Sequence, residues 1–274
     1  MTIESGPVLD LLMEKVYREG KYDFREYKRG TITRRLESRL HATGSKTCLD
    51  YMQFLDSHPE EYHQLAECLT IKVSEFFRSP YTFEQVTRRV VPELIAHKIK
   101  RGGNSLSLWS AACACGEEPY SLAILIANHL GKKQPVFGIS IYATDISWRA
   151  LEKACAGIYA RGDVGDLPAA IRQNYFIPQL EYYRVRDSIR QMVSFSHFDL
   201  TSTTEPPFVN VDCIFCRNVL IYLQSKLQER VLNTLYDSLS TPGYLVLGEV
   251  ENLTSSLRKK LECLDSEAKI YKKV

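Results

Sequence analysis

The sequence predicts an α/β domain, with a mainly parallel sheet and helices on both faces, joined to a small N-terminal all-helical domain. Residues 8–70 carry apolar side chains at helical spacing throughout. From Leu106 onward, short apolar runs alternate with amphipathic segments, which is the pattern of a doubly wound sheet. The 274 residues are 45% hydrophobic, which is enough to build one large core and a smaller one.

Four helices are expected in the N-terminal domain, residues 1–70. The segments VLDLLMEKVYREG, TITRRLESRLHATG, CLDYMQFLDSHP and EEYHQLAECLT each repeat apolar residues every three or four positions. Gly20, Gly44 and Pro59 punctuate these segments, as residues that end helices or open turns do. The pattern therefore predicts a compact group of short helices.

Residues 71–90 form a connecting segment that fits neither half. Phe76, Phe77, Tyr81 and Phe83 crowd together around Arg78. A free linker is expected to be polar and flexible, so this aromatic density indicates a segment that packs onto a neighbouring surface.

Residues 91–274 are expected to form the α/β domain. The runs SLSLWSA, GISIYATD, VDCIFCRNVLIY and GYLVLGEV are typical of strands, and helical segments lie between the first three. Residues 175–195, YFIPQLEYYRVRDSIRQMVSF, alternate apolar and polar side chains and predict a small antiparallel β excursion.

Composition excludes several classes of protein. The formal net charge of +2 is too small to predict a nucleic-acid partner, and neither a signal pattern nor a membrane-length apolar run is present, so a cytoplasmic protein without membrane insertion is expected. A monomer is also expected. The eight cysteines are therefore read as free thiols. Cys213 and Cys216 would point to opposite faces of a strand, so no metal site is expected.

The first strand-turn-helix, LWSAACACGEEPYSLAILIANHL, breaks the rule for phosphate binding. Its turn holds one glycine and ends in Glu117 and Glu118, with Pro119 suited to the first helical turn. A carboxylate at this position repels phosphate and attracts a cation. Capping of the helix N-terminus is the alternative role for Glu118.

Acidic residues also follow the next strands. Asp145 ends IYATD, where it would accept both ribose hydroxyls of a nucleoside, with capping of the following helix as the alternative. An acidic first turn, an acidic second strand end and no phosphate-binding glycines together select S-adenosylmethionine. Asp199 and Leu200 follow MVSFSHF and would lie near the adenine, although an ordinary loop is the alternative.

Four motifs resemble one family. SEFFR, SAACACGEEPYS, ATDI and FCRNVLIY occur in the order and spacing of the CheR-type chemotaxis protein methyltransferases, which methylate glutamates of chemoreceptors. YKRGTITRRLESRL is similar to that family's basic helical region, so the resemblance covers nearly the whole chain. It implies a Rossmann-like class I methyltransferase sheet, S-adenosylmethionine as cofactor, S-adenosylhomocysteine as product and a role in chemotaxis adaptation.

The resemblance also implies roles for the acidic residues already singled out. Glu118 would hold the methionine amino group of the cofactor, and Asp145 would hold its ribose. Asp199 and Leu200 would lie on the adenine side.

Roles for five further residues follow from the resemblance alone. Arg217 and Asn218 would form the wall that faces the sulfonium. Ser74 and Arg78 would close over the cofactor, and Arg78 with Tyr222 would flank the reaction centre.

The sequence departs from the family pattern at a few positions. Lys72 stands where the family commonly has Asn, Ser74 where Thr is usual, and Cys115 replaces a common Thr. GEVEN replaces the frequent GHSEN, which leaves Glu249 unexplained.

A cluster of basic residues in the N-terminal domain suggests how a receptor is engaged. Arg35 and Arg39 lie one helical turn apart and are expected to bind the acidic cytoplasmic helices of methyl-accepting chemoreceptors. A solvated face is the alternative, and the lack of interleaved aromatic residues argues against nucleic acid. The cluster comprises Arg25, Lys28, Arg29, Arg34, Arg35 and Arg39.

Two other functions remain open from the sequence. One is a non-catalytic scaffold that binds S-adenosylmethionine and a signalling helix, and the other is a methyltransferase for a small acid or a nucleic acid. Arg78 with Tyr222 argues against the scaffold. The short turn within residues 175–195 favours a protein that does not tether a receptor peptide.

Overall fold

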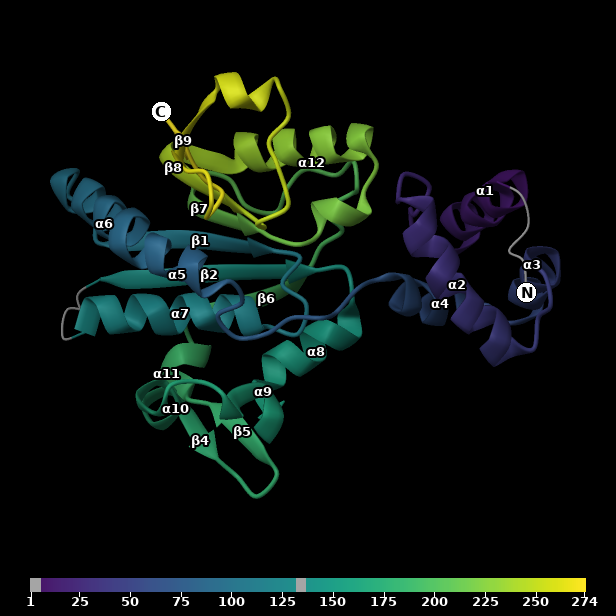
Figure 1. Cartoon of the computed structure of the whole chain (residues 1–274), viewed down its shortest axis with the longest axis horizontal. Coiled ribbons are helices and arrows are strands. Elements are labelled where there is room, and N and C mark those ends of the chain that lie inside the picture. The colour runs from purple at the N-terminus through teal and green to yellow at the C-terminus, as the bar shows by residue number, and fades with distance from the viewer. Residues whose placement is uncertain (1–5, 132–136) are drawn as a thin grey trace. The chain divides into compact units, whose positions relative to one another are not determined.

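The computed structural model describes residues 6–131 and 137–274, which divide into two compact units. The first unit holds the described residues up to Ile71 together with Thr201–Thr203 and Tyr222–Arg230. The second holds the remaining described residues from Lys72 onward. Figure 1 colours the helices of the first unit purple to dark blue and shows the large sheet of the second.

The described residues of the first unit up to Ile71 form four α-helices. Gly44, at φ 72°, ends the second helix in the left-handed conformation, and the Thr47 hydroxyl accepts a hydrogen bond from the Asp50 amide to begin the third. Leu12, Leu36 and other apolar residues form a shared core because each helix turns its apolar stripe inward. The helices are α1 (Gly6–Lys15, continued by a π-helical turn Val16–Gly20), α2 (Arg29–Thr43), α3 (Cys48–Ser57) and α4 (Glu61–Leu69).

The second unit contains a seven-stranded mixed sheet in the order β6-β2-β1-β7-β8-β10-β9. The strands from β6 to β8 are parallel to their neighbours, and β10 runs antiparallel to β8 and β9. Their bounds are β1 (Ser105–Ala111), β2 (Gly138–Asp145), β6 (Val193–His197), β7 (Val211–Cys216), β8 (Leu239–Leu247), β9 (Leu261–Asp265) and β10 (Ile270–Lys273). The predicted α/β fold class with a helical N-terminal domain is confirmed.

Helices cover both faces of this sheet because the chain winds outward from β1 in both directions. From β1 it steps through helices to β2 and β6, and from β7 it steps through α12 to β8 on the other side. The helices are α5 (Pro80–Gln85, continued by a π-helical turn Val86–Val90), α6 (Val91–Lys100), α7 (Glu117–Leu130), α8 (Trp148–Ala156) and α12 (Ser225–Ser238).

The antiparallel excursion is a separate three-stranded sheet in the order β3-β5-β4, and Figure 1 shows β4 and β5 grouped with the short helices α9, α10 and α11. It begins with β3, earlier than the expected residues 175–195. It ends before Val193, because Val193 pairs with Ile141 of the main sheet. The elements are β3 (Ile158–Ala160), α9 (Arg161–Gly165), α10 (Ala169–Tyr175), β4 (Phe176–Pro178), β5 (Tyr182–Val185) and α11 (Asp187–Arg190).

Aromatic residues of the connecting segment dock it onto the second unit. Phe76 is buried edge-on against Tyr159 and Phe176, with ring centroids 4.8 and 5.3 Å away. Phe77 packs against Phe83, which in turn lies over Phe215 of β7. Arg78 is therefore held beside the sheet by buried rings on both sides of it in the sequence.

Two features of the described residues bear on partners and metals. Residues 6–131 and 137–274 include no helix with the length and apolar character needed to cross a membrane. The same residues include no group of three or more His, Cys, Asp or Glu side chains arranged to hold a metal ion.

Candidate functional site

The predicted cofactor residues of the second unit gather at one edge of its sheet. Strands β1, β2, β6 and β7 are parallel neighbours, so their carboxyl ends share an edge. Glu118, Asp145, Asp199 and Arg217 each follow or end one of these strands. Ligands of open α/β sheets bind at this edge where the winding direction changes, which here is between β1 and β7.

The turn after β1 has a strained, tightly packed backbone. Ala112, Ala114 and Gly116 adopt left-handed φ angles of 62°, 49° and 94°. A Cβ on Gly116 would lie 2.8 Å from the Ala154 Cβ, so only glycine fits. Left-handed alanines are costly and persist where the surrounding structure over-determines them, which is common at ligand sites.

Glu118 lies half-buried in the first turn of α7. One carboxylate oxygen accepts a hydrogen bond from the Ser110 hydroxyl at 2.8 Å, and the other lies 3.5 Å from a guanidinium nitrogen of Arg217. Burial raises the pKa of Glu118, and the Arg217 charge opposes that rise. Arg217 therefore offsets only part of the effect of burial on the Glu118 carboxylate.

Glu117 is a site residue that sequence reasoning passed over. Its side chain is 95% buried, since its exposed fraction is 5%, and its Oε2 has no hydrogen-bond partner among the described residues. Burial raises the pKa of Glu117, while the Ser74 hydroxyl of the connecting segment lowers it. The doubled acid in GEEP was the available signal, because two adjacent carboxylates at a helix mouth repel phosphate more strongly than one.

Asp145 ends β2 and connects two turns. Its Oδ2 accepts the Ala114 amide at 2.8 Å, and its Oδ1 accepts the Ser147 amide at 2.9 Å. The cap of α8 is Ser147, whose hydroxyl accepts the Ala150 amide at 3.0 Å. The capping alternative for Asp145 is therefore wrong in detail, since Asp145 supports the cap residue and the first turn.

Asp199 and Leu200 follow β6 beside the end of β2. The Phe198 amide donates to the Asp145 carbonyl oxygen at 3.1 Å, which carries the pairing of the two strands past β6. Leu200 is buried and Asp199 is half-buried. Both predicted adenine-side residues therefore lie on the edge that carries Asp145.

The loop after β7 reaches back to the connecting segment. The expected strand 211–222 stops at Cys216, and Asn218 takes a left-handed φ of 61°. The buried Arg217 guanidinium donates to the Arg78 carbonyl oxygen at 2.9 Å. Glu251 accepts the Asn218 amide at 2.9 Å, so a second residue outside the predicted set shapes this loop.

The connecting segment is bound to the same edge at its own backbone. The Phe77 amide donates to the Ser121 hydroxyl of α7 at 2.9 Å. Phe77 and Ser79 take left-handed φ angles of 52° and 63° on either side of Arg78. These contacts fix the backbone of Arg78, and the Ser74 hydroxyl reaches Glu117, so both predicted residues of the segment lie with the sheet edge.

Buried charge at this edge is strongly unbalanced. Among the described residues, the buried charged groups there are the carboxylates of Glu117, Asp145 and Glu251 and the guanidinium of Arg217, and the half-buried Glu118 carboxylate lies beside them. Four anions against one cation in a desolvated site favour a cationic ligand. An ammonium and a sulfonium on one small molecule meet that requirement.

Three other predicted residues belong to the first unit. The Tyr222 carbonyl oxygen accepts the Lys28 amide at 2.8 Å, which groups Tyr222 with the helices. Arg39 donates two hydrogen bonds to the Glu61 carboxylate at 2.8 and 2.6 Å. Arg35 donates to the carbonyl oxygens of Cys68 and Thr70 at 2.8 and 3.3 Å.

Arg35 and Arg39 therefore fasten α2 to both ends of α4. Arg39 meets the Glu61 carboxylate at the start of α4. Arg35 meets the Cys68 carbonyl oxygen in the last turn of α4, where the helix dipole is negative. Lys28 and Arg34 are exposed and form no ion pair with any described residue. In the predicted basic cluster, Lys28 and Arg34 therefore present their charges to solvent, whereas Arg35 and Arg39 are bonded to α4.

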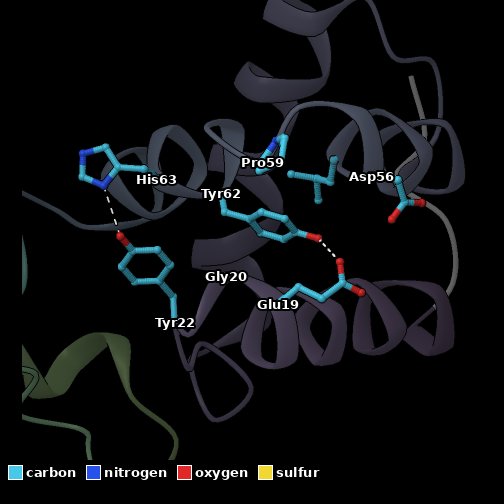
Figure 2. Close-up of a pocket in the computed structure, with 8 residues that line it drawn as sticks. Glu19, Gly20, Tyr22, Asp56, Pro59, Tyr62 and His63 are labelled. Atoms are coloured by element: carbon cyan, nitrogen blue, oxygen red, sulfur yellow. Dashed lines mark hydrogen bonds between the residues drawn. The ribbon is translucent and has the colours of Figure 1, made fainter.

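The helical unit also contains a pocket, shown in Figure 2. The Tyr62 hydroxyl donates to Glu19 at 2.5 Å, and the Tyr22 hydroxyl lies 3.1 Å from His63 Nδ1. Lys15 forms ion pairs with the two carboxylates of the pocket and thereby balances them. The lining residues, none of which is a predicted site residue, are Glu19, Gly20, Tyr22, Leu55, Asp56, Pro59, Tyr62 and His63.

Comparisons with known proteins cover both units. The family described as CheR methyltransferase, all-alpha domain, matches residues 8–70, and CheR methyltransferase, SAM binding domain, matches residues 72–270. A chemotaxis protein methyltransferase of Klebsiella aerogenes is 33% identical, over 90% of this chain and 83% of that protein. One of Borreliella burgdorferi is 29% identical, over 93% of this chain and 90% of that protein. An uncharacterized 104.1 kDa protein of Rhodobacter capsulatus is 33% identical over 92% of this chain, which spans 26% of that longer protein.

Proposed function

Because the chain belongs to the CheR methyltransferase family and has its S-adenosylmethionine-binding domain, we propose that it methylates glutamate side chains of chemoreceptors, forming methyl esters. The observation that carries the proposal is the excess of buried carboxylates at the carboxyl edge of the sheet, with Glu117 Oε2 left without a partner. This charge suits a cationic cofactor. The relatives named as chemotaxis protein methyltransferases support the receptor as substrate.

The residues at this edge fit S-adenosylmethionine group by group. Glu118 and the neighbouring Glu117 offer carboxylate oxygens to the ammonium group. Asp145, whose carboxylate accepts the Ala114 and Ser147 amides at the end of β2, is placed to receive the ribose hydroxyls as well. Asp199 and Leu200 offer one polar and one apolar contact for adenine.

Methyl transfer to a carboxylate makes modest demands on the protein. When bound, S-adenosylmethionine supplies a methyl group activated by its positive sulfur. A glutamate side chain is already an anion at neutral pH, so no general base is required. The protein's contribution is positioning, which can supply roughly 7 to 11 kcal/mol of the barrier.

Arg78 is the residue of the second unit proposed to position the receptor carboxylate, and the family resemblance alone adds Tyr222 to this role. The planar Arg78 guanidinium can orient both carboxylate oxygens, while its backbone is fixed by Arg217 and by the docked phenylalanines. The Tyr222 hydroxyl offers a weaker donor, which leaves the nucleophilic oxygen reactive. Ser74 closes over the cofactor in this proposal.

For receptor recognition we propose the basic face of α2 and the segment before it. Arg35 and Arg39 were the residues expected to contact the receptor, and their internal bonds mean that replacing them also disturbs α4. Lys28 and Arg34 present their charges to solvent and can attract an acidic receptor helix. Variants at Lys28 and Arg34 should therefore change receptor binding without disturbing the packing of α2 on α4.

The decisive experiment is transfer of a tritiated methyl group from S-adenosylmethionine to a chemoreceptor cytoplasmic fragment. Label released as methanol by mild alkali identifies a carboxyl methyl ester, since amide and amine methyl groups resist this treatment. A receptor fragment with its acidic methylation residues changed to alanine is the matched control. Cofactor binding without transfer would support a non-catalytic scaffold, and alkali-stable label would mean a different acceptor.

A further inference from the structure

A buried carboxylate outside the predicted set organises the loop after β7. Glu251 is 3% exposed and lies just after β8. Its Oε2 accepts the amides of Gly248 and Asn218 at 2.7 and 2.9 Å. Its Oε1 accepts the amides of Leu220 and Ile221 at 2.7 and 3.4 Å.

The surrounding chain is shaped to let this carboxylate approach. A Cβ on Gly248 would lie 2.7 Å from Glu251 Oε2 and 2.9 Å from the Asn218 nitrogen. Because Gly248 has no side chain, the end of β8 can lie directly against the loop after β7. Asn218 adopts its left-handed conformation at this point of contact.

Only an ionised carboxylate satisfies all of these donors. A glutamine has one acceptor oxygen, and its amide nitrogen would face two backbone N–H groups that also donate. Buried amides without acceptors are costly, so the loop would have to move to find other partners. Residues 217–221 pair with no strand, and Leu220 and Ile221 begin a short 3-10 helix, Leu220–Tyr222, whose first amides donate to Glu251.

The loop held by Glu251 leads directly to the proposed site. Arg217, the first residue of the loop, donates to the Arg78 carbonyl oxygen at 2.9 Å and lies 3.5 Å from Glu118. Its side chain is 2% exposed, so it has little room to adjust if the loop shifts. A displacement of Asn218 and Leu220 would therefore be transmitted to Arg217, and from there to the connecting segment and to Glu118.

We propose that Glu251 is a positioning residue for methyl transfer, which acts by fixing the 217–221 loop so that Arg217 and Asn218 hold the cofactor site in shape. This rests on the function proposed above. Because the contacts of Glu251 are to backbone amides, its proposed effect on the cofactor site passes through the loop.

The test compares Glu251→Gln with the matched control Glu249→Gln in the full-length protein. Glu249 lies two residues away, is exposed, and loses the same charge on substitution. Calorimetry measures the Kd for S-adenosylmethionine without receptor, at a temperature where both variants are folded by circular dichroism. Hydrogen exchange of the peptide covering residues 217–221 reports the loop directly.

We expect Glu251→Gln to weaken cofactor binding at least tenfold and to speed exchange of the Asn218 and Leu220 amides, while Glu249→Gln changes neither by more than twofold. Gly248→Ala, which presses on the same contact without removing the carboxylate, should weaken binding in the same direction and serves if Glu251→Gln does not fold. A folded Glu251→Gln protein with wild-type Kd, or one that loses only thermal stability, overturns the proposal. Absence of methyl transfer by the wild type would contradict the proposed function and leave this comparison of Kd intact.

Discussion

Replacing Asp145 by alanine should separate cofactor recognition from support of the fold. The proposed ribose contact is a hydrogen bond to a charged group, and such bonds contribute about 1.5 to 3 kcal/mol. Its loss corresponds to a Kd for S-adenosylmethionine raised about tenfold to 150-fold. The prediction concerns binding alone and needs no receptor.

The same substitution also removes acceptors from two backbone amides. Ala114 and Ser147 donate to Asp145 at 2.8 and 2.9 Å, and Asp145 itself is 8% exposed. Each amide left unpaired in such a place costs about 1 to 3 kcal/mol, so the free energy of unfolding should fall by about 2 to 6 kcal/mol. Binding must therefore be measured on protein shown to be folded.

Two further variants separate the contributions. Asp145→Asn retains one acceptor oxygen, so it should lose less stability than alanine while still losing the charged contact to ribose. Ser147→Ala removes the cap of α8, which costs about 1 kcal/mol of stability, and should leave the Kd unchanged. The assays are isothermal calorimetry for Kd and urea unfolding for stability.

The reasoning fails if Asp145→Asn binds S-adenosylmethionine within a factor of two of the wild type. That result would mean that the carboxylate serves the two backbone amides only. Equal weakening by Ser147→Ala would place the effect in the start of α8.

Three other predictions test chemistry, electrostatics and docking. Arg78→Lys keeps the charge but loses the planar fork of donors, so kcat should fall more than cofactor affinity. In the wild-type enzyme the single-turnover rate should not vary with pH between about 6 and 8, because no general base is needed. An Arg78→Lys enzyme with full kcat, or a wild-type rate that rises tenfold per pH unit, would refute positioning without base catalysis. Burial raises the pKa of Glu117 and of Glu118, so the stability that these groups contribute is present at low pH and lost as pH rises through their raised pKa values. A bound cation reverses that penalty, so cofactor affinity should increase with pH in the weakly acidic range with release of protons, which calorimetry in buffers of different ionisation enthalpy measures; affinity independent of pH and buffer would contradict this. Changing Lys28 and Arg34 together to Glu should raise the receptor KM at low salt and reduce its salt dependence at constant cofactor Kd; an unchanged receptor KM would return both to an ordinary solvated surface.

Much of the fold could be predicted because it depends on local patterns. The helices of the first unit follow the 3.6-residue period, and β1, β2 and β7 follow apolar runs bounded by turns. The antiparallel β9 and β10 were not predicted, because strands of only five and four residues carry weak patterns. The limits of the β excursion were also displaced, since Val193 could have paired in either sheet until its register with Ile141 was formed.

The candidate site divides in the same way. Glu118, Asp145 and Arg217 stand directly after or at the ends of strands, and parallel strands bring their ends to one edge whatever the details of packing. Glu117 matters because its carboxylate is buried, with one oxygen that has no hydrogen-bond partner among the described residues. Glu251 matters because it accepts hydrogen bonds from amides 30 or more residues away in the sequence. Spacing in the sequence reveals neither property.

The sequence by itself determined the order of elements, the acidic character of the strand ends and the family. Only the tertiary structure decided which charged side chains are paired with other groups of the protein and which face solvent. Arg39 meets Glu61 and Arg35 meets the last carbonyls of α4, so these two cations support the helical unit, while Lys28 and Arg34 face solvent. The physical reason is that a side chain's charge is set by its type, whereas the partner that neutralises it is set by which distant segments the core brings together.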